Sequence, residues 1–250
     1  MVLKRQVLLW DFEEYWYDES AYLHSFADIV ALRTHSRLNN YHLRIPEFTL
    51  IISLKKSVEE IAKKFTSTLR NNIKQANKQF QIQKIVSDKD RAAFYDAYIP
   101  FAKTRKLLVP NPEEESDLEI YTAMDAEGEL VQASAFLPIP SMGIYRYRYG
   151  VSLKKSLTNK AILYQALLDA KAQGFKIFDF GGIEKFAKEG SKEAGINQFK
   201  LAFGGEELET HLYLKGNTLI SKFVLQGCEK LGLGKRLQKL SSLCAYWARK

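Results

Sequence analysis

The stretch Ile177-Phe178-Asp179-Phe180-Gly181-Gly182 decides the fold that we predict for this chain. Residues 175–180 are apolar enough to form a strand, and the glycine pair follows at the strand's end. After a polar loop, residues 195–205 hold a single lysine, Lys200, directly behind an aromatic residue, Phe199. Strand ends in α/β enzymes are where ligands usually bind. We therefore expect a catalytic site where these two segments meet.

The residues before this strand predict a crossover unit. Residues 144–151 form a strand, then Thr158 or Asn159 caps a helix that Gly174 ends. Because a strand, a helix and a strand in this order form a crossover, the two strands should be parallel neighbours. The first strand should have one aromatic face and one cationic face, since its tyrosines alternate with its arginines: Tyr145, Tyr147 and Tyr149 against Arg146 and Arg148.

The remaining elements complete a mixed α/β sheet. Ser57 to Glu60 have the spacing of a capping box, and apolar residues then recur at helical spacing as far as Ala76, with an interruption expected at 66–68. We also expect a helix that begins at Asp88 and is bent or ended by Pro100. The other predicted elements are a strand at 48–54, a first helical turn at 111–115, a hairpin of 118–124 with 129–137, a short helix at 196–202, a strand at 208–214 and a basic amphipathic helix after Asn217.

The charges are unevenly distributed along the chain of 250 residues. Residues 215–250 contain eight basic residues and one acid, Glu229, and so hold +7 of the formal net charge of +8. A second basic block spans 55–91, and an acidic block without a basic residue spans 113–129. Such blocks are either solvated helix faces or surfaces that attract phosphate or anionic lipid. No apolar run is long enough for a membrane-spanning helix, and the N-terminus lacks the pattern of a signal peptide.

Four pieces with glycines and aromatic residues occur in a fixed order, at 67–76, 149–152, 178–182 and 195–205. Together they resemble the Fem family of peptidoglycan interpeptide-bridge aminoacyltransferases and their relatives in the GNAT (acyl-CoA N-acyltransferase) superfamily. The resemblance covers residues 48–214. It implies a GNAT-like fold, an activated acyl donor and an amine acceptor. In Fem enzymes the donor is aminoacyl-tRNA and the acceptor is a cell-wall precursor.

Two features depart from this family. Fem enzymes have two GNAT-like domains, whereas the chain has room for one full domain, 48–214, with an N-terminal extension, 1–47, and a basic tail, 215–250. GNAT enzymes that use coenzyme A bind its pyrophosphate through a glycine-containing loop, and residues 152–159 contain no glycine. Because backbone amides approach a phosphate closely only where side chains are missing, this loop disfavours the usual binding of coenzyme A.

The resemblance places the aromatic–lysine pair, Phe199 and Lys200, at the site of acyl transfer. When an amine attacks an ester or thioester carbonyl, negative charge develops on the oxygen, and a fixed cation lowers the barrier. Lys200 is our candidate for that cation, with an ordinary surface lysine as the alternative. Asp179 is a candidate to orient the acceptor amine or to take its proton. Its alternative role is to cap the loop that follows it.

The candidate substrate-binding residues are less sharply defined. Arg70 and Lys74 stand four residues apart on one helix face and suit an anionic group, although a solvated basic stripe has the same pattern. The tyrosines of 144–151 suit an acceptor cleft or simply the core. The complete set is Arg70, Lys74, Tyr147, Arg148, Tyr149, Ser152, Gly181 and Gly182.

These features predict an N-acyltransferase that acts on an amine, and an amine of a cell-wall or glycan-linked precursor is one interpretation of the acceptor. No cofactor is expected, because the donor is a substrate, and the scattered histidines do not have metal-ligand spacing. An acyl-CoA-dependent N-acetyltransferase is one alternative. A non-catalytic module that binds nucleic acid or a membrane surface through the basic tail is the other. We expect a cytoplasmic protein, with tRNA as a partner and peripheral contact of the tail with the inner face of the membrane as further interpretations.

Overall fold

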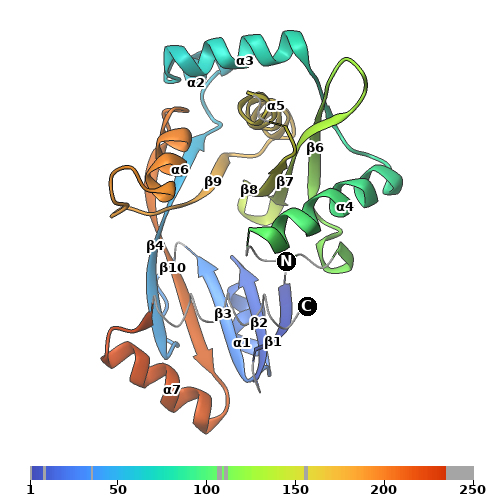
Figure 1. Cartoon of the computed structure of the whole chain (residues 1–250). Helices are drawn as coiled ribbons and strands as arrows, with labels where there is room; N and C mark the ends of the chain where they lie inside the picture. Colours follow the sequence, from blue (N-terminus) through green and yellow to red (C-terminus); the bar gives the residue numbers. More distant parts are fainter. Residues whose placement is uncertain are drawn as a thin grey trace. The chain divides into compact units, whose positions relative to one another are not determined.

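A computed structural model describes residues 2–7, 10–34, 36–105, 109, 112–154 and 157–234 (Figure 1). The chain forms two compact units. The first consists of residues 1–47, 99–116 and 209–250, and the second of 48–98 and 117–208. The boundary at 47/48 is that of the sequence analysis, but 99–116 and 209–214 group with the N-terminal residues. Strand pairing joins segments that are distant in sequence. Each unit therefore consists of several separate segments, which a division of the chain into consecutive ranges could not predict.

Within residues 1–47, whose role the sequence left open, the described part contains four strands and a helix, all or part of which belong to the first unit. Its elements are β1 (Val2–Val7), β2 (Trp10–Trp16), α1 (Glu19–His24), β3 (Ile29–Thr34), the start of β4 (Leu43–Ser53), η1 (Pro112–Glu115), the end of β10 (Glu206–Gly216) and α7 (Leu219–Lys230). β2 pairs with β3 in parallel, whereas the pairs β1–β2 and β3–β10 are antiparallel. One side of these strands contributes to a core of Phe12, Ile29, Ala31, Leu43, Ile45, Leu212, Leu214 and Leu225.

The second unit contains the predicted mixed sheet. Its strands follow the order β4-β9-β8-β7-β6-β5. Only the pair β8–β9 is parallel among the pairs described in this unit, which confirms the predicted crossover. The bounds of the strands not yet given are β5 (Gln81–Lys84), β6 (Glu119–Met124), β7 (Leu130–Ile139), β8 (Ile144–Ser152) and β9 (Ile177–Ile183).

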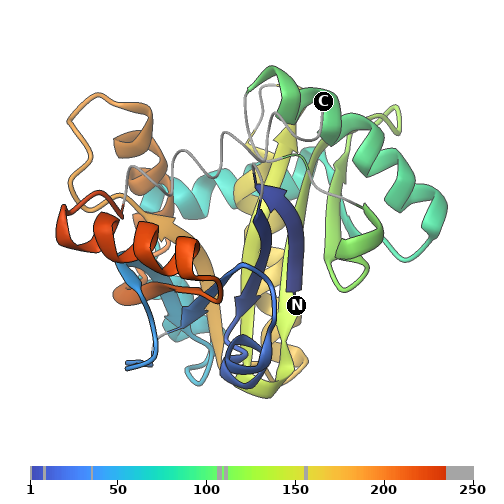
Figure 2. The same cartoon turned by 90° about the horizontal axis from the view of Figure 1, so that it is seen from below.

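Helices cover both faces of this sheet. α4 (Asp88–Thr104) and α5 (Thr158–Ala172) lie on opposite sides of strands β6 to β8 (Figures 1 and 2). α2 (Val58–Lys63) and α3 (Ser67–Gln79) follow β4, and α6 (Lys192–Leu201) follows β9. The predicted capping box of Ser57 and Glu60 is present at the start of α2. Thr66 caps α3, so the expected interruption is the boundary between two helices.

Three local predictions need correction. Leu157, without a side-chain cap, precedes α5, so Thr158 is the first helical residue and not the cap. Pro100 does not end α4, which continues to Thr104, so of the two expected effects of this proline the ending of the helix is wrong. β9 extends to Ile183, so Gly181 and Gly182 are part of the strand and do not follow it.

The core of the second unit lies between the sheet and the helices α2, α3 and α5. Buried aromatic residues dominate it, among them Phe136, Tyr145, Phe178, Phe180 and Phe203. Their rings contact one another with centroids 4.7 to 6.0 Å apart. Such packing fixes the strands that carry the candidate site, since each large ring constrains its neighbours. No helix in the described part of the chain is long and apolar enough to cross a membrane.

Candidate active site

The parallel strands β8 and β9 pair over only three residues. The pairs run from Ile144–Ile177 to Arg146–Asp179, although β8 continues to Ser152 and β9 to Ile183. Beyond Arg146 and Asp179, no further pair between these two strands is described. The predicted site residues Gly181 and Gly182 lie on β9 directly after this point.

A β-bulge in β8 changes which side chains share a face. Phe136 pairs with Tyr147 and Ala135 with Tyr149, so Arg148 is the extra residue of β8. Tyr145 and Tyr147 both contact Phe136, with ring centroids 5.6 Å apart in each case. Tyr149 instead stacks on Tyr98 of α4, at 4.5 Å. The prediction of a single aromatic face is therefore wrong, because the bulge reverses the alternation after Arg148.

Asp179 is the centre of a buried polar network. Its carboxylate is 1 % exposed, forms an ion pair with the Arg146 guanidinium and accepts hydrogen bonds from the Thr49 hydroxyl and from the Gly181 N–H, the last at 2.8 Å. All of these partners are donors, and together they engage both oxygens of the carboxylate. This geometry corresponds to the alternative role of Asp179, which is to fix the backbone that follows it.

Lys200 is buried beside this network. Only 8 % of the residue is exposed, and its Nζ donates to the carbonyl oxygen of Gly182 at 2.7 Å. Burial lowers the pKa of Lys200 from 10.5 to about 8, the neighbouring Arg146 lowers it as well, and Asp179 opposes both effects. With that pKa, about nine-tenths of the side chain is protonated at pH 7. Lys200 is thus a buried cation and not an ordinary surface lysine.

Gly181 lies beside two cations. It has φ +77°, a conformation that side chains rarely adopt. A Cβ at this position would lie 3.8 Å from Lys200 Nζ, 3.9 Å from Arg146 Nη2 and 3.4 Å from the carbonyl oxygen of Tyr147. An oxygen that acquires negative charge in contact with both cations would be stabilised by an ammonium and a guanidinium together.

The position of α6 is fixed by contacts on either side of Lys200. Ser191 caps the helix through the N–H of Ala194. The Asn197 side chain donates to the Glu184 carbonyl at 2.8 Å and accepts from the Glu184 N–H at 3.3 Å. Phe199 packs edge-on against Phe203, with centroids 6.0 Å apart. Phe199 therefore anchors the helix in the core, and its neighbour Lys200 reaches the strand.

Sequence reasoning missed three residues of this site. Arg146 was noted only as part of a cationic face, and Thr49 and Asn197 were not considered. The residue pattern predicted that β8 and β9 are parallel, but it did not give their register. It is the register that places Arg146 opposite Asp179. For Thr49 and Asn197 the sequence contains no comparable signal, because their partners lie on other elements.

Other predicted residues lie elsewhere in the second unit. The Arg70 guanidinium donates to the carbonyl oxygens of Phe65 and Ala62, so it satisfies the end of α2. Lys74 is exposed on α3. The Ser152 hydroxyl donates to the Lys154 carbonyl at 2.9 Å. None of the contacts described for these side chains joins them to Lys200.

Tyr147 contributes a second polar group next to the last pair described between β8 and β9. Burial raises the pKa of Tyr147 to about 12, although a hydrogen bond with Ser134 opposes the shift. The Ser134 hydroxyl in turn donates to Asn159 at the start of α5, at 3.3 Å. A Cβ on Gly150 would lie 2.7 Å from the Ala133 carbonyl and 3.2 Å from the Tyr147 hydroxyl. The tyrosine thus remains neutral and able to donate at physiological pH.

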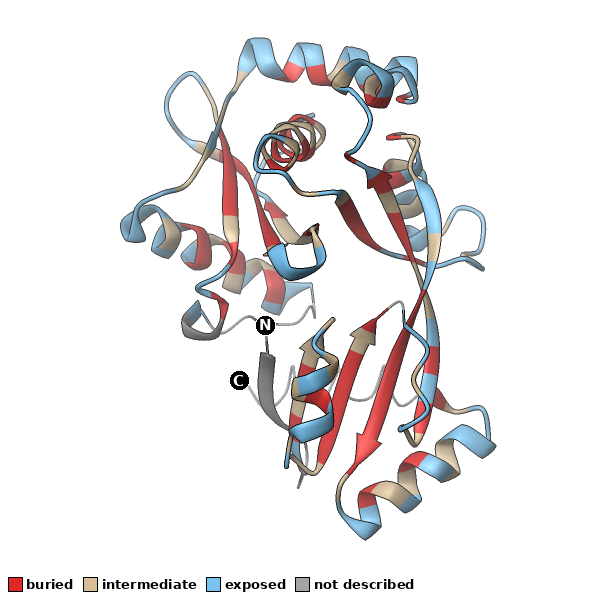
Figure 3. Ribbon diagram, turned by 180° about the vertical axis from the view of Figure 1, so that it is seen from behind, coloured by how far each residue is buried: buried red, intermediate tan, exposed pale blue. Residues whose placement is uncertain are grey.

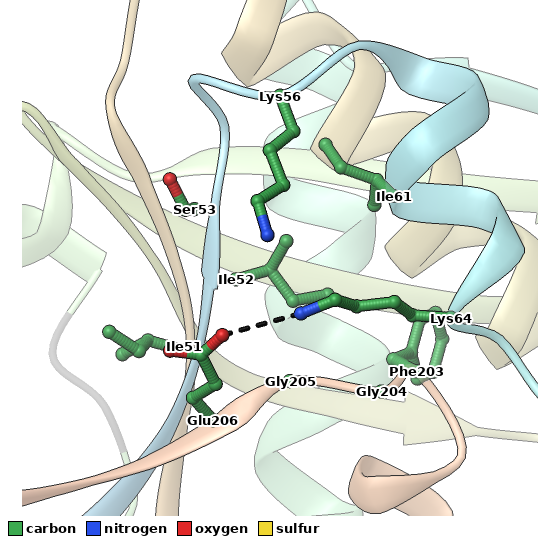
Figure 4. Close-up of a pocket in the computed structure, with 10 residues that line it drawn as sticks. All are labelled: Ile51, Ile52, Ser53, Lys56, Ile61, Lys64, Phe203, Gly204, Gly205 and Glu206. Atoms are coloured by element: carbon green, nitrogen blue, oxygen red, sulfur yellow. Dashed lines mark hydrogen bonds and ion pairs between the residues drawn. The ribbon is translucent and has the colours of Figure 1, made fainter.

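A shallow pocket adjoins the end of α6 (Figure 4). Lys56 and Lys64 extend their side chains into it, and Lys64 forms an ion pair with Glu206 at 3.3 Å. Gly204 has φ +67°, and a Cβ there would lie 2.4 Å from the Lys64 carbonyl, so only glycine fits. Lys200 is not among the residues that line this pocket. In the described part of the chain, no three His, Cys, Asp or Glu side chains gather as metal ligands.

Solved structures with the same fold include enzymes of two kinds. The structure of FemX has a TM-score of 0.63 and 13 % identity, and the match covers 90 % of this chain and 86 % of FemX. L-PGS from Bacillus licheniformis has a TM-score of 0.53 and 11 % identity, and the match covers 92 % of this chain and 85 % of L-PGS. The C-terminal domain of a putative lysylphosphatidylglycerol synthetase from Agrobacterium fabrum has a TM-score of 0.55 and 9 % identity, and the match covers 93 % of this chain and 85 % of that domain's chain.

These likenesses confirm the predicted fold, a mixed α/β fold of the Fem-like GNAT type. At 9 to 13 % identity they show the fold alone. Neither protein-family models nor curated proteins match the sequence. The matches extend over 90 % or more of this chain, so they include residues of both units and not only residues 48–214.

Proposed function

We propose that the chain is an N-acyltransferase that moves an activated acyl or aminoacyl group to an amine acceptor. The observation that carries this proposal is the pair of buried cations, Lys200 and Arg146, beside Gly181: a Cβ on that glycine would lie 3.8 Å from Lys200 Nζ and 3.9 Å from Arg146 Nη2. Two neighbouring buried cations are suited to an oxygen that becomes anionic. The shared fold with FemX and the lysylphosphatidylglycerol synthetases supports the same class of reaction.

The chemical step assigns a role to each of these groups. The acceptor amine attacks the carbonyl carbon of the donor, and the electron pair of the C=O bond moves to the oxygen. Lys200 and Arg146 stabilise that oxyanion, which then collapses and expels the alcohol or thiol of the donor. The Asp179 carboxylate positions Arg146 and the Gly181 N–H without exchanging a proton. The proton that the amine loses passes to the leaving group or to water.

For the donor, an aminoacyl-tRNA is favoured over acyl-CoA. The turn from β8 to α5 has no glycine between Val151 and Asn159, which would keep backbone amides away from a pyrophosphate. Lys154 in this turn is held by Asp125 and Glu129, at 2.7 Å each. The net charge of +8 suits the phosphates of a tRNA. An acyl-CoA-dependent N-acetyltransferase is the alternative.

For the acceptor, we propose an amine on a cell-wall or glycan-linked precursor in the cytoplasm. A membrane-bound precursor would require contact with the inner face of the membrane, which we assign to the basic residues after 214. Eight cations and one acid in this region are suited to anionic lipid headgroups. Residues 235–250 of the predicted tail lie outside the described residues.

The test is the transfer of a labelled amino acid from tRNA to a set of amine acceptors. We expect Lys200→Met to lower turnover about 100- to 1000-fold, which is typical for the loss of one oxyanion-stabilising group. Lys188→Met, which removes an exposed lysine, is the matched control and should keep full turnover. Equal turnover in both variants would exclude Lys200 from the chemistry. Transfer from acyl-CoA but not from tRNA would favour the alternative donor.

The non-catalytic alternative predicts another pattern. If the chain only binds nucleic acid or a membrane surface, no donor should be consumed, whereas salt-dependent tRNA or vesicle binding should persist in Lys200→Met. Measurements of binding and turnover on the same variant therefore separate the two functions.

A further inference from the structure

Five large apolar side chains are strongly exposed in the first unit: Leu231 at the end of α7, 72 % exposed, and four others. Phe26 is 98 % exposed, and Leu219, Ile220 and Phe223 at the start of α7 are 85, 69 and 79 % exposed. Single exposed apolar residues are ordinary, but a group of this size usually marks an interaction surface. The outward turns of α7 are correspondingly exposed in Figure 3.

Hydrogen bonds hold the loop of Phe26 against the beginning of α7. The Asn217 side chain donates to the carbonyl oxygens of Ser25 and Ala27, at 2.9 and 2.7 Å. The Asn217 N–H and the Ser221 hydroxyl both donate to the Asp28 carbonyl at 2.9 Å. The residues on either side of Phe26 are thus fixed to the helix start, and we call Phe26 together with Leu219, Ile220 and Phe223 the Phe26–α7 surface.

The inner face of α7 is well packed, so the outer residues are not needed for the fold. Ser221 and Leu225 are buried, and Leu225 belongs to the core of the first unit. A Cβ on Gly216 would lie 2.6 Å from the Ser221 hydroxyl oxygen, which shows how closely the helix is seated. Because the backbone is already fixed by these contacts, binding through the outer residues would cost little ordering of the chain.

The charges of the helix favour an anionic occupant. Lys222 and Lys230 are its cations. Its single acid, Glu229, accepts the backbone N–H of Arg44 at 3.1 Å and is therefore occupied by β4. The sequence of 235–250 adds five basic residues and no acid. Apolar side chains accompanied by lysines are the pattern of helices that lie in a membrane interface.

We propose that the Phe26–α7 surface binds to an anionic lipid membrane, with its four apolar side chains among the headgroups and upper acyl chains. The proposal rests on the membrane contact in the proposed function, but not on the acyl-transfer chemistry. A second copy of the chain suits this surface less well. Four side chains of about 150 Å² supply about 600 Å², below the ~800 Å² per partner of a stable protein interface.

The test is co-sedimentation of the full chain with vesicles of phosphatidylcholine alone or with 30 % phosphatidylglycerol. We expect binding to the anionic vesicles, with at least about a tenfold loss of affinity in Phe26→Ser/Phe223→Ser, because each phenylalanine loses a buried apolar contact. Phe186→Ser is the matched control, since Phe186 is 81 % exposed in the second unit. Its affinity should equal that of the wild type.

Several results would overturn the proposal. Wild-type protein that ignores anionic vesicles, or a double variant that binds them as well as the wild type, would remove the Phe26–α7 surface from membrane contact. A concentration-dependent dimer that the double variant abolishes would identify the occupant as a second copy. Binding of free inorganic phosphate or soluble phosphoglycerol with similar affinity would assign the effect to the lysines alone. Transfer to a soluble amine acceptor should be unchanged in the double variant, so failure of the membrane proposal and failure of the acyltransferase proposal are distinguishable.

Discussion

Replacing Lys200 with methionine tests the burial of its charge directly. The wild-type lysine has a pKa of about 8 in the folded chain and an ordinary value of 10.5 when unfolded. Below pH 8 it is charged in both states, so the folded state bears the whole cost of burying an ammonium. Between pH 8 and 10.5 the folded state releases its proton first, and that cost disappears. Stability should therefore rise with pH in this window because of Lys200.

The magnitude follows from the shift in pKa. A shift of about 2.5 units corresponds to ~3 kcal/mol at pH 7, since one unit is 1.36 kcal/mol. Methionine removes this cost but also removes the hydrogen bond to the Gly182 carbonyl, which offsets about 1 kcal/mol or more. We expect Lys200→Met to be about 1–2 kcal/mol more stable than the wild type at pH 7. Its advantage should fall by about 2.5 kcal/mol by pH 10.

Urea unfolding at pH 7, 8.5 and 10 measures this advantage. The change with pH isolates the charge, because the lost hydrogen bond contributes about equally at every pH. Lys188→Met, at an exposed lysine, should show no such change and controls for the other titrating groups. A difference between Lys200→Met and the wild type that is constant from pH 7 to pH 10 would refute the reasoning. Lys200 would then titrate like a solvated lysine.

Two further predictions concern the backbone and the ion pair of the site. Gly181→Ala should cost about 1–2 kcal/mol because of its left-handed conformation, and it should lower turnover by placing a methyl group against Lys200 and Arg146. Gly182→Ala, whose Cβ would lie 3.9 Å from the nearest described atom, is the control, and equal thermal stability of the two variants would contradict the argument. Asp179→Asn should cost about 3–5 kcal/mol in chemical denaturation, because it leaves the Arg146 guanidinium buried without its carboxylate. It should also lower the pKa of Lys200 further, since Asp179 raises it, and so shift the fall in turnover at high pH to a lower pH; an unchanged pH profile would show that the two groups are not coupled. Asp125→Asn, which alters an ion pair with Lys154 at the surface, should change neither the free energy of unfolding nor the pH dependence of turnover appreciably.

The local elements of the second unit could be predicted because their signals are local. The capping box at Ser57, the hairpin around Asp125 to Gly128 and the crossover from β8 through α5 to β9 depend on residues within a few turns of one another. Hydrophobic periodicity then decides which face of each element is buried. Lys200 was identified as a candidate on different grounds, namely the resemblance of the surrounding residues to a known family.

The composition of the site depended on contacts that no local pattern encodes. Arg70 was predicted to bind substrate, but its guanidinium is used by carbonyl groups at the end of α2. Arg146 became a site residue only through its register opposite Asp179, and the bulge at Arg148 moved Tyr149 to the other face. A shift of one residue in a strand reverses every side chain after it, so small errors of register change a predicted site completely.

The elements of the second unit, the parallel crossover and a lysine at the expected place could be predicted from the residue pattern. The burial of Lys200, the engagement of both Asp179 oxygens by donors and the pairing of β3 with β10 became visible in the folded chain. The physical reason is the range of the interactions. Helix caps and hydrophobic periodicity act between neighbours in the chain, whereas burial of a charge depends on every segment that excludes water from it.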